Sequence, residues 1–484
     1  MKSTCCNRHE VPLSRRELLA KAGLGLGAMA LGTLLDRNGL LAAEVAASSR
    51  RGDPLAPRPP QLAAQGKAVI SLFMQGGPSQ VDTFDPKPLL HRFDGHPLPE
   101  SFKSDDLKLQ FMSAAGATLM ASPYPFRPRG QSGLEISDLF PRLAEHADEL
   151  AVVRSCYHES FIHGPALSLM HTGSTLLGHP SVGSWVVYGL GCESDNLPAF
   201  MVMADGALRG SNSTFSSGFL PAVYQGTMIR TEGAPIQNLA PPPQVTAEEQ
   251  RALLDQVGAW NRAHLQARQD DSNLAARIAN YELAFRMQSA APDLIDLSGE
   301  PTETLELYGA DREPTAQFGR MCLLARRMVE RGVRFVELYC TDWDGHSDCP
   351  ANHQDNAAKV DRPIAGLIAD LRRRGLLEST VLVWAGEFGR TPIMQGNKGR
   401  DHNPYGFSCW LAGGGIQGGK SIGSTDDLGF RAVADKVHVH DLHATILSLL
   451  GIDHEKLTYL FEGRRRRLTD IGGENNLAPR LTRA

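Results

Sequence analysis

Short apolar runs recur along the chain, and they constrain its fold more than any other feature of the sequence. Each run is bounded by Gly, Pro or polar residues, which is typical of buried strands. The runs span residues 67–74, 149–153, 199–202, 334–339, 380–385 and 407–412. Helical patterns lie between several of them, so the sequence predicts an α/β fold with a doubly wound, mainly parallel sheet flanked by helices. In such sheets, ligands bind beyond the carboxyl ends of the strands.

Two helical stretches can be placed from their patterns. Thr246 and Glu249 have the spacing of a capping box, and the amphipathic segment after them continues to about residue 288. A second stretch, with apolar residues at helical spacing, covers residues 361–377. We expect residues 67–484 to form a single large domain with a helical insertion near 246–290, because α/β domains of this length are common.

The N-terminal segment has the layout of a cleavable export signal. Arg15 and Arg16 precede an apolar run at residues 22–35, and small residues follow. The run is diluted by glycines and is shorter than the roughly 20 residues of a bilayer span, so no permanent membrane span is expected. We therefore predict a twin-arginine signal peptide over residues 1–47, a linker over residues 48–66, and a periplasmic or extracellular location.

Export in the folded state bears on the partners and cofactors of the chain. The twin-arginine translocase, its expected partner during export, carries folded proteins, often with a cofactor bound, which favours a metal or another prosthetic group. The formal net charge is -5, and the one basic run, Arg464 to Arg467, is short, so no nucleic-acid partner is expected. The cysteines beyond the signal form no CxxC pair, which disfavours a zinc ribbon. Disulfides remain possible, and Cys340 with Cys349 is the nearest pair.

Side chains that bind metals gather just after two of the predicted strands and in a nearby loop. They are Asp342, Asp344 and His346 after the run at 334–339, Glu387 after the run at 380–385, and His402 in the loop that follows. Oxygen and nitrogen ligands from three neighbouring loops are what a divalent metal site needs. The sequence therefore predicts a metal site at the carboxyl edge of the sheet.

These segments resemble the alkaline phosphatase superfamily, which includes sulfatases and cofactor-independent phosphoglycerate mutase. Asp342 and His346 share the Asp-x-x-x-His spacing of the mutase, and His402 lies where a later metal-binding His is expected. The segment from His163 to Gly173 is similar to the sulfatase signature in its Pro, Thr and Gly spacing. His163 occupies the position of the modified cysteine, so the resemblance implies an ester hydrolase without a formylglycine nucleophile. That position is expected to open a helix, whose N-terminus favours an anionic ester.

The chain more closely resembles one branch, the exported, planctomycete-type family called domain of unknown function 1501. The motifs that carry this resemblance lie at residues 75–87, 179–185, 386–392 and 400–404, within a region of about 67–470. The chain departs from the family at Gln80, where the family typically has His. This puts a role of that side chain in metal binding or proton transfer in doubt.

The resemblance implies a set of roles for a hydrolase of small or polymeric sulfate or phosphate esters that uses divalent ions such as Zn, Mn or Ca. One ion would be held by Asp342, His346 and His402. A second ion or a water would be surrounded by Glu387 and His163, with Gln75 or Asp82.

Two of these roles have alternatives. His163 could attack the ester directly, although a ligand role is favoured by the neighbouring acids. Arg390 could clamp an anionic oxygen, or it could form a structural pair with Asp401 or Glu387. The alternative for the whole chain is a non-catalytic protein that binds polysaccharide or a partner at the cell surface.

Overall fold

The computed structural model describes residues 54–102, 118–231, 244–267, 272–470 and 472–482. The expected signal peptide, residues 1–47, lies outside the described residues, as does the beginning of the expected linker. Residues 55–484 form one compact unit. The end of the expected linker packs on this unit, because the backbone N–H groups of Gln61 and Gln65 donate to Gly451 O and Leu449 O, both at 2.8 Å.

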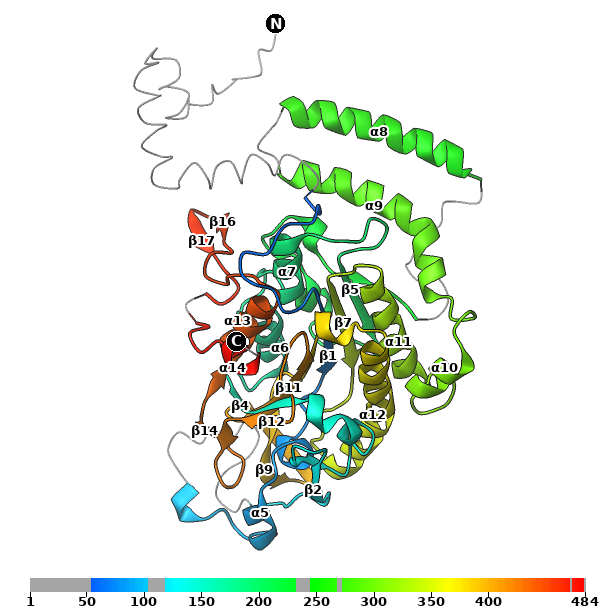
Figure 1. The fold of residues 1–484 in the computed structure, drawn as a ribbon. Coiled ribbons are helices and arrows are strands. Elements are labelled where there is room, and N and C mark those ends of the chain that lie inside the picture. Colours follow the sequence, from blue (N-terminus) through cyan, green and yellow to red (C-terminus); the bar gives the residue numbers. More distant parts are fainter. Residues whose placement is uncertain (1–53, 103–117, 232–243, 268–271, 471, 483–484) are drawn as a thin grey trace, which may run out of the picture. The chain divides into compact units, whose positions relative to one another are not determined.

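A nine-stranded sheet forms the centre of this unit in the described residues, with the order β12-β4-β11-β8-β1-β7-β5-β6 and with β15 beside β4 (Figure 1). All six predicted runs are strands of this sheet. They are β1 (Ala68–Met74), β4 (Ala151–Tyr157), β5 (Phe200–Ala204), β7 (Phe335–Cys340), β8 (Thr380–Ala385) and β11 (Phe407–Gly413). The remaining strands of the sheet are β6 (Thr227–Met228), β12 (Lys420–Ile422) and β15 (Val437–His438).

The sheet is mainly parallel, as the sequence predicts. β1 lies between β7 and β8 and is parallel to both. β5 is parallel to β7 and to β6, whereas β11 is antiparallel to β8 and β4. Every residue of β7 and β8 is buried, which is why these strands appear in the sequence as mainly apolar runs, with Glu337 as the one charged residue in them.

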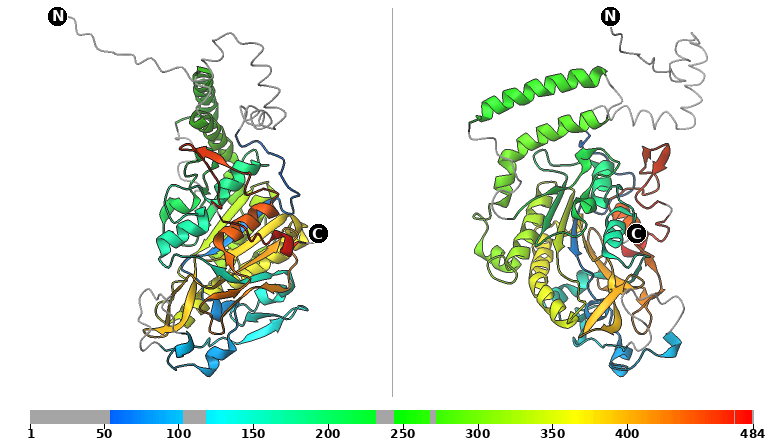
Figure 2. Two further views of the ribbon diagram at one scale, coloured as in Figure 1. Left: turned by 90° about the vertical axis from the view of Figure 1, so that its left-hand side faces the viewer. Right: turned by 180° about the vertical axis from the view of Figure 1, so that it is seen from behind.

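Helices cover both faces of the sheet. The main helices are α6 (His163–Thr172), α7 (Val182–Leu190), α8 (Ala247–Ala267), α9 (Ser272–Ile295), α10 (Thr302–Tyr308), α11 (Ala316–Glu330), α12 (Cys349–Arg373) and α13 (Val439–Leu449). Short helices are α4 (Gln80–Thr83), α5 (Pro88–Arg92) and α14 (Ala478–Leu481). Figure 1 shows α11 and α12 on one side of the sheet and α6, α7 and α13 on the other, and Figure 2 shows the same layers from two further directions.

Alternate residues of β1 divide between the two layers, which is what a doubly wound sheet requires. Val69 and Phe73 belong to the core under α6, α7 and α13. Ile70 and Leu72 belong to the core under α11 and α12. Side chains of successive strand residues point to opposite faces, so one apolar strand serves both cores.

The structure refines the predicted helices. Thr246 and Glu249 form the expected capping box before α8, because Thr246 N donates to Glu249 Oε2 at 2.9 Å and Glu249 N donates to Thr246 Oγ1 at 3.2 Å. The helix predicted over 361–377 begins earlier and ends sooner, since α12 spans Cys349–Arg373. Of the helices in the described ranges, none has the combination of length and apolar character that crossing a bilayer demands.

Cys340 and Cys349, the nearest candidate pair in the sequence, do not form a disulfide. Both thiols are free and buried, as are the other cysteines of the described residues. The fold instead brings together the thiols of Cys156 and Cys409 on the neighbouring strands β4 and β11, with 3.2 Å between the Sγ atoms. Strand pairing rather than nearness in sequence therefore brings thiols together here.

Candidate metal centre

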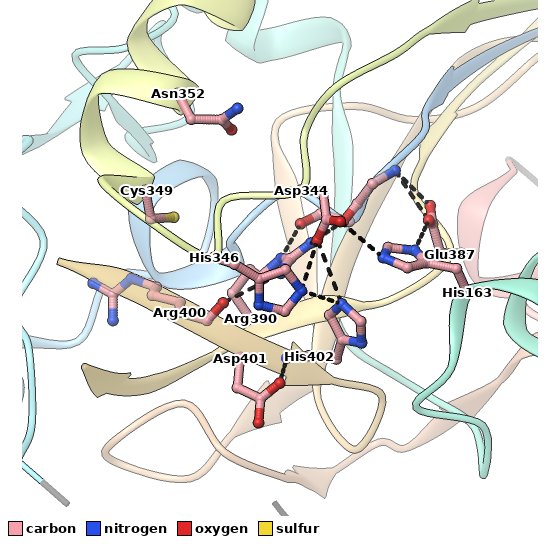
Figure 3. Close-up of polar contacts among 12 residues, drawn as sticks. His163, Asp344, His346, Cys349, Asn352, Glu387, Arg390, Arg400, Asp401 and His402 are labelled. Carbon is pink, nitrogen blue, oxygen red and sulfur yellow. Dashed lines mark hydrogen bonds and ion pairs between the residues drawn. The ribbon is translucent and has the colours of Figure 1, made fainter. Parts of the chain in front are cut away.

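Three histidines and one aspartate meet beyond the carboxyl ends of the central strands. Asp344 and His346 follow β7, and His163 is the first residue of α6. His402 lies on β10 (Gly399–Asn403), which pairs with β9 (Gly389–Gln395) after β8. One nitrogen or oxygen of each side chain lies within 4.8 Å of the others, an arrangement that could hold a metal ion. Figure 3 shows the three imidazoles directed at the Asp344 carboxylate. We call these four residues the metal group.

The contacts within the metal group are made by the Nε2 atoms. Asp344 Oδ1 lies 3.1 Å from His346 Nε2 and 3.4 Å from His402 Nε2. Asp344 Oδ2 lies 3.2 Å from His163 Nε2. The Nε2 atoms of His346 and His402 are 2.9 Å apart. All three rings therefore present the same nitrogen to one point.

The other ring nitrogens are held by hydrogen bonds to oxygen atoms. His163 Nδ1 lies 2.7 Å from Glu387 Oε1, His402 Nδ1 lies 2.8 Å from Phe161 O, and His346 Nδ1 lies 2.7 Å from Gln395 Oε1. A carboxylate or carbonyl oxygen only accepts hydrogen bonds, so these Nδ1 atoms carry the hydrogen. In the neutral rings, the Nε2 lone pairs then face the centre of the group, which is the usual arrangement of metal-binding histidines.

These residues fit a divalent cation. The buried Nε2 of His163 forms no hydrogen bond of good geometry, although Asp344 Oδ2 lies 3.2 Å away. Two Nε2 lone pairs at 2.9 Å repel each other unless a proton or a cation lies between them. Three imidazoles and a carboxylate are also a common donor set for first-row transition metals and zinc.

Charges around Asp344 keep its carboxylate ionised. Burial alone would raise the pKa of Asp344, but the adjoining imidazoles of His163, His346 and His402 and the charge of Arg390 hold it far below its ordinary value. Burial lowers the pKa of His402, and the charge of Arg390 adds to this. The carboxylates of Asp344 and Glu387 raise the pKa of His163 in spite of its burial. The metal group thus offers an ionised carboxylate and at least one neutral imidazole.

Glu387 holds the His163 ring in place through Nδ1, the nitrogen that does not face Asp344. It is fully buried after β8, accepts hydrogen bonds from Gly76 N at 3.0 Å on each carboxylate oxygen, and contacts His163 Nδ1. Gly76 has φ +119°, and a Cβ there would lie 2.5 Å from Asp344 N. Only glycine permits this close approach of the loops after β1 and β7, which places Glu387, His163 and Asp344 together.

The structure brings His163, His346 and His402 together but leaves Asp342 outside the metal group. The Asp342 side chain is exposed, and its carbonyl accepts hydrogen bonds from Asn352 Nδ2 at 2.7 Å and Asn356 Nδ2 at 2.9 Å. Its φ of 73° turns the chain at this point. The carboxylate beside the three histidines is that of Asp344. A turn sets this choice, because His346 N donates to Asp344 O at 3.0 Å, and the sequence marks both aspartates equally.

Three other expected ligands have different partners. Gln75 Oε1 accepts a hydrogen bond from Arg209 N at 3.1 Å. Asp82 forms a buried ion pair with Arg400, at 2.8 Å from its Nε. Glu387 reaches the metal group only through His163.

Gln80 likewise has a structural explanation. Its Nε2 donates to Arg390 O at 2.9 Å and to Gly429 O at 2.8 Å. This amide joins the loop after β1 to β9, so its contacts give no sign of a role in metal binding.

The two arginines at Asp344 differ in exposure. Arg390 is fully buried and donates to Asp344 Oδ1 at 2.6 Å, to Gly77 O at 2.9 Å and to Gly76 O. Its partner is therefore Asp344 rather than Asp401 or Glu387. Arg209 has a side chain that is 42% exposed and places Nη1 2.7 Å from Asp344 Oδ2. No motif or periodicity in the sequence marks Arg209.

Comparison with known proteins identifies the family. The model of the family described as "Protein of unknown function (DUF1501)" matches residues 66–478, so the chain belongs to this family. Among curated proteins, none matches the chain.

The chain is also similar to several solved structures, at low identity. The lipoteichoic acid synthase LtaP from Listeria monocytogenes is 9% identical with a TM-score of 0.39, covering 88% of this chain and 81% of its own. The PsFucS1 sulfatase from Pseudoalteromonas sp. is 13% identical with a TM-score of 0.34, covering 81% of this chain and 68% of its own. A TAB5 alkaline phosphatase mutant with Mg bound is 11% identical with a TM-score of 0.36, covering 81% of this chain and 99% of its own.

Proposed function

We propose that this member of the DUF1501 family is an exported, metal-dependent hydrolase of phosphate or sulfate esters that works without a formylglycine nucleophile. The observation that carries the proposal is the convergence of three Nε2 atoms and the Asp344 carboxylate at the carboxyl edge of the sheet. This edge is where α/β sheets bind their ligands. The predicted twin-arginine signal over residues 1–47 supports export to the periplasm or the exterior.

The donor set favours particular ions. Imidazole nitrogens suit zinc and the later transition metals, whereas calcium takes oxygen ligands almost exclusively. We therefore expect zinc ahead of manganese, and either of them ahead of calcium. A bound divalent ion would supply Lewis acidity toward an ester oxygen and would make a nearby water more acidic.

The residues around the ion would orient it and attract an anionic ester. Glu387, Phe161 O and Gln395 fix the three rings through their Nδ1 atoms. Arg390 and Arg209 offset the charge of Asp344, so with a divalent ion the centre is net positive. A positive, partly buried centre favours the binding of phosphate or sulfate oxygens.

His163 serves as a ligand in this proposal rather than as a nucleophile. Its Nε2 faces Asp344 and its Nδ1 is held by Glu387, so neither nitrogen is directed to solvent as an attacking atom. The attacking group is then a water, since His stands where the sulfatase signature has its modified cysteine.

A non-catalytic role is the second candidate, and the number of ligands favours it. Four protein ligands fill a tetrahedral shell, and closed four-coordinate zinc sites are usually structural. Such a centre would support a protein that binds a partner or polysaccharide at the cell surface. The two candidates differ in whether the metal-loaded protein turns over esters.

Metal analysis of the purified mature protein tests the proposal. We expect about one zinc or manganese per chain in the wild type, and its loss in His346→Ala and His402→Ala, with His91→Ala on the surface of α5 as the control. Loss of a direct ligand should cost more than the roughly 10–100-fold of a lost outer partner. The metalloenzyme hypothesis fails if no stoichiometric metal is present and both variants keep wild-type melting temperatures with added zinc, manganese or calcium. A screen of phosphate and sulfate esters then separates the two candidates.

A further inference from the structure

A cavity near the metal group has no role in the chemistry proposed above. Its volume is about 670 Å³, within the range of sites that hold drug-sized organic molecules. Its lining includes the polar residues Asn212, Thr231 and Gln317 and three charged residues, Arg230, Arg320 and Glu313. The cavity therefore suits a polar molecule with negative charge.

The loop after β5 joins this cavity to the metal group. Gly206, Leu208 and Asn212 line the cavity. Arg209 belongs to the same loop and places Nη1 2.7 Å from Asp344 Oδ2. Consecutive Cα atoms are about 3.8 Å apart, so the cavity wall at Leu208 directly adjoins the arginine that reaches the metal group.

Hydrogen bonds hold this loop against three elements. Arg209 N donates to Gln75 Oε1 at 3.1 Å, at the end of β1. Thr341 N donates to Asp205 Oδ1 at 2.8 Å, at the end of β7. Gln317 Nε2, on α11, donates to Asp205 O at 3.0 Å. The position of the cavity relative to Asp344 is therefore set by the fold.

Arg209 is better placed than Arg390 to contact a substrate. Its side chain is 42% exposed, whereas the Arg390 side chain is fully buried and donates to backbone carbonyls. An arriving anion can reach the guanidinium of Arg209, whose planar donors suit phosphate and sulfate oxygens.

We infer that the metal group and the cavity are two halves of one substrate site, and that the substrate is a hydroxylated organic ester carrying at least one further negative charge. Arg209 holds the charged oxygens of the ester at the metal group. The cavity receives the rest of the molecule, with its hydroxyls toward Asn212, Thr231 and Gln317 and its second charge toward Arg230 and Arg320. This inference rests on the proposed function, because it assigns a substrate class to that site.

Binding of two matched ligands tests the inference. The probes are non-hydrolysable phosphonate analogues of glucose 6-phosphate and of glucose 1,6-bisphosphate, titrated calorimetrically into metal-loaded protein at constant ionic strength. We expect the bisphosphate analogue to bind about tenfold more tightly, a typical size for one partly exposed charge contact. Arg230→Ala should remove this preference, and Arg209→Ala should weaken both ligands. Arg465→Ala, on the exposed hairpin strand β17 (Arg464–Arg466), is the charge-matched control and should keep the preference.

A second variant, Arg320→Ala, keeps the test decisive if Arg230→Ala does not fold. Arg320 lies within α11, where Ala is favourable for the helix, so Arg320→Ala should fold and should also reduce the preference. The inference is overturned if the wild type binds both analogues equally or binds neither, or if the preference survives in both variants.

Metal content and inorganic phosphate binding, measured on the same samples, separate this result from the proposed function. Metal and phosphate binding without a preference for the bisphosphate refutes the cavity assignment alone. A preference that depends on Arg230 in protein that binds no metal supports the cavity assignment and refutes the metallohydrolase.

Discussion

The two ends of α6 place a histidine beside a carboxylate in opposite surroundings. At the N-terminal end, His163 belongs to the partly exposed metal group. In the last turn, His171 lies in the core, where its Nε2 is 3.3 Å from Glu337 Oε1 and 2.9 Å from Tyr339 Oη. Tyr339 Oη donates to Glu337 Oε2 at 3.0 Å, and His171 Nδ1 donates to Leu167 O at 2.8 Å. We call His171, Glu337 and Tyr339 the core network.

The core network and the metal group differ in the hydrogen-bond partners of their histidine ring nitrogens. In the core network, both ring nitrogens of His171 have partners, so the network is complete without a ligand. In the metal group, three Nε2 atoms converge on one carboxylate, and that of His163 forms no hydrogen bond of good geometry with it in the described residues. A His and a carboxylate together are therefore not enough to indicate a functional site, whereas convergent lone pairs are. The core network fastens α6 to β7 and so helps to position His163.

The largest predicted effect is a loss of stability in acid, which arises in the buried core next to α6. His443 is buried under α6, where its Nε2 donates to Met170 O at 2.7 Å, and burial lowers its pKa from 6.5 to about 3. The native ring stays neutral while the unfolded ring takes up a proton below pH 6.5. The free energy of unfolding should therefore fall between about pH 6.5 and 3, by up to about 5 kcal/mol from this group.

Urea unfolding between pH 7 and pH 4 checks this expectation. His443→Gln should lower the slope of unfolding free energy against pH by about 1.4 kcal/mol per pH unit below pH 6. An unchanged slope would show that His443 is not the titrating group.

Breaking the core network should give the next largest effect. Glu337 is buried, and Glu337→Ala leaves His171 and Tyr339 without their acceptor. Loss of one partner of a buried pair typically costs about 3–5 kcal/mol. Urea unfolding measures the loss, and Glu337→Gln, which keeps the shape and one acceptor, should lose less. If Glu337→Ala were as stable as the wild type, the network would not fasten α6.

Removing support from the metal group should act on metal affinity rather than on folding. Glu387→Gln replaces an acceptor of the Gly76 N–H by an amide and removes the charge behind His163. We expect metal affinity to fall by roughly 10–100-fold, measured by chelator competition. Glu378→Gln, which removes the same charge on the surface, is the control. Equal affinities of the two variants would contradict a supporting role for Glu387.

The smallest effect is expected at Asp342. Asp342→Asn keeps a residue that tolerates the positive φ, so stability should change by less than about 0.5 kcal/mol and metal content should stay constant. Asp344→Asn, two residues away, should lose metal under the same conditions. A loss of metal in Asp342→Asn would restore the assignment of Asp342 as a ligand.

Part of the fold could be predicted because buried segments are marked by apolar residues that are adjacent in the sequence. β7 and β8 are buried on both faces, so each appears as an apolar run, and their order with helices between them predicts a parallel sheet. The capping box at Thr246 is equally local, because its two partners are three residues apart. The start of α12 is less evident from the sequence, because its first turns, from Cys349, are rich in polar residues and lack the apolar spacing of the later turns.

The residue pattern is enough to indicate a doubly wound sheet, polar residues after its strands, and His163, His346 and His402 as candidates for metal binding. Three features emerge only in the folded chain: Asp344 rather than Asp342 lies beside these histidines, Glu387 contacts His163, and Arg209 rather than Arg390 is exposed. Apolar periodicity indicates which segments are buried. The direction of a polar side chain depends instead on loop torsions and on contacts between distant segments, such as Gly76 against Asp344.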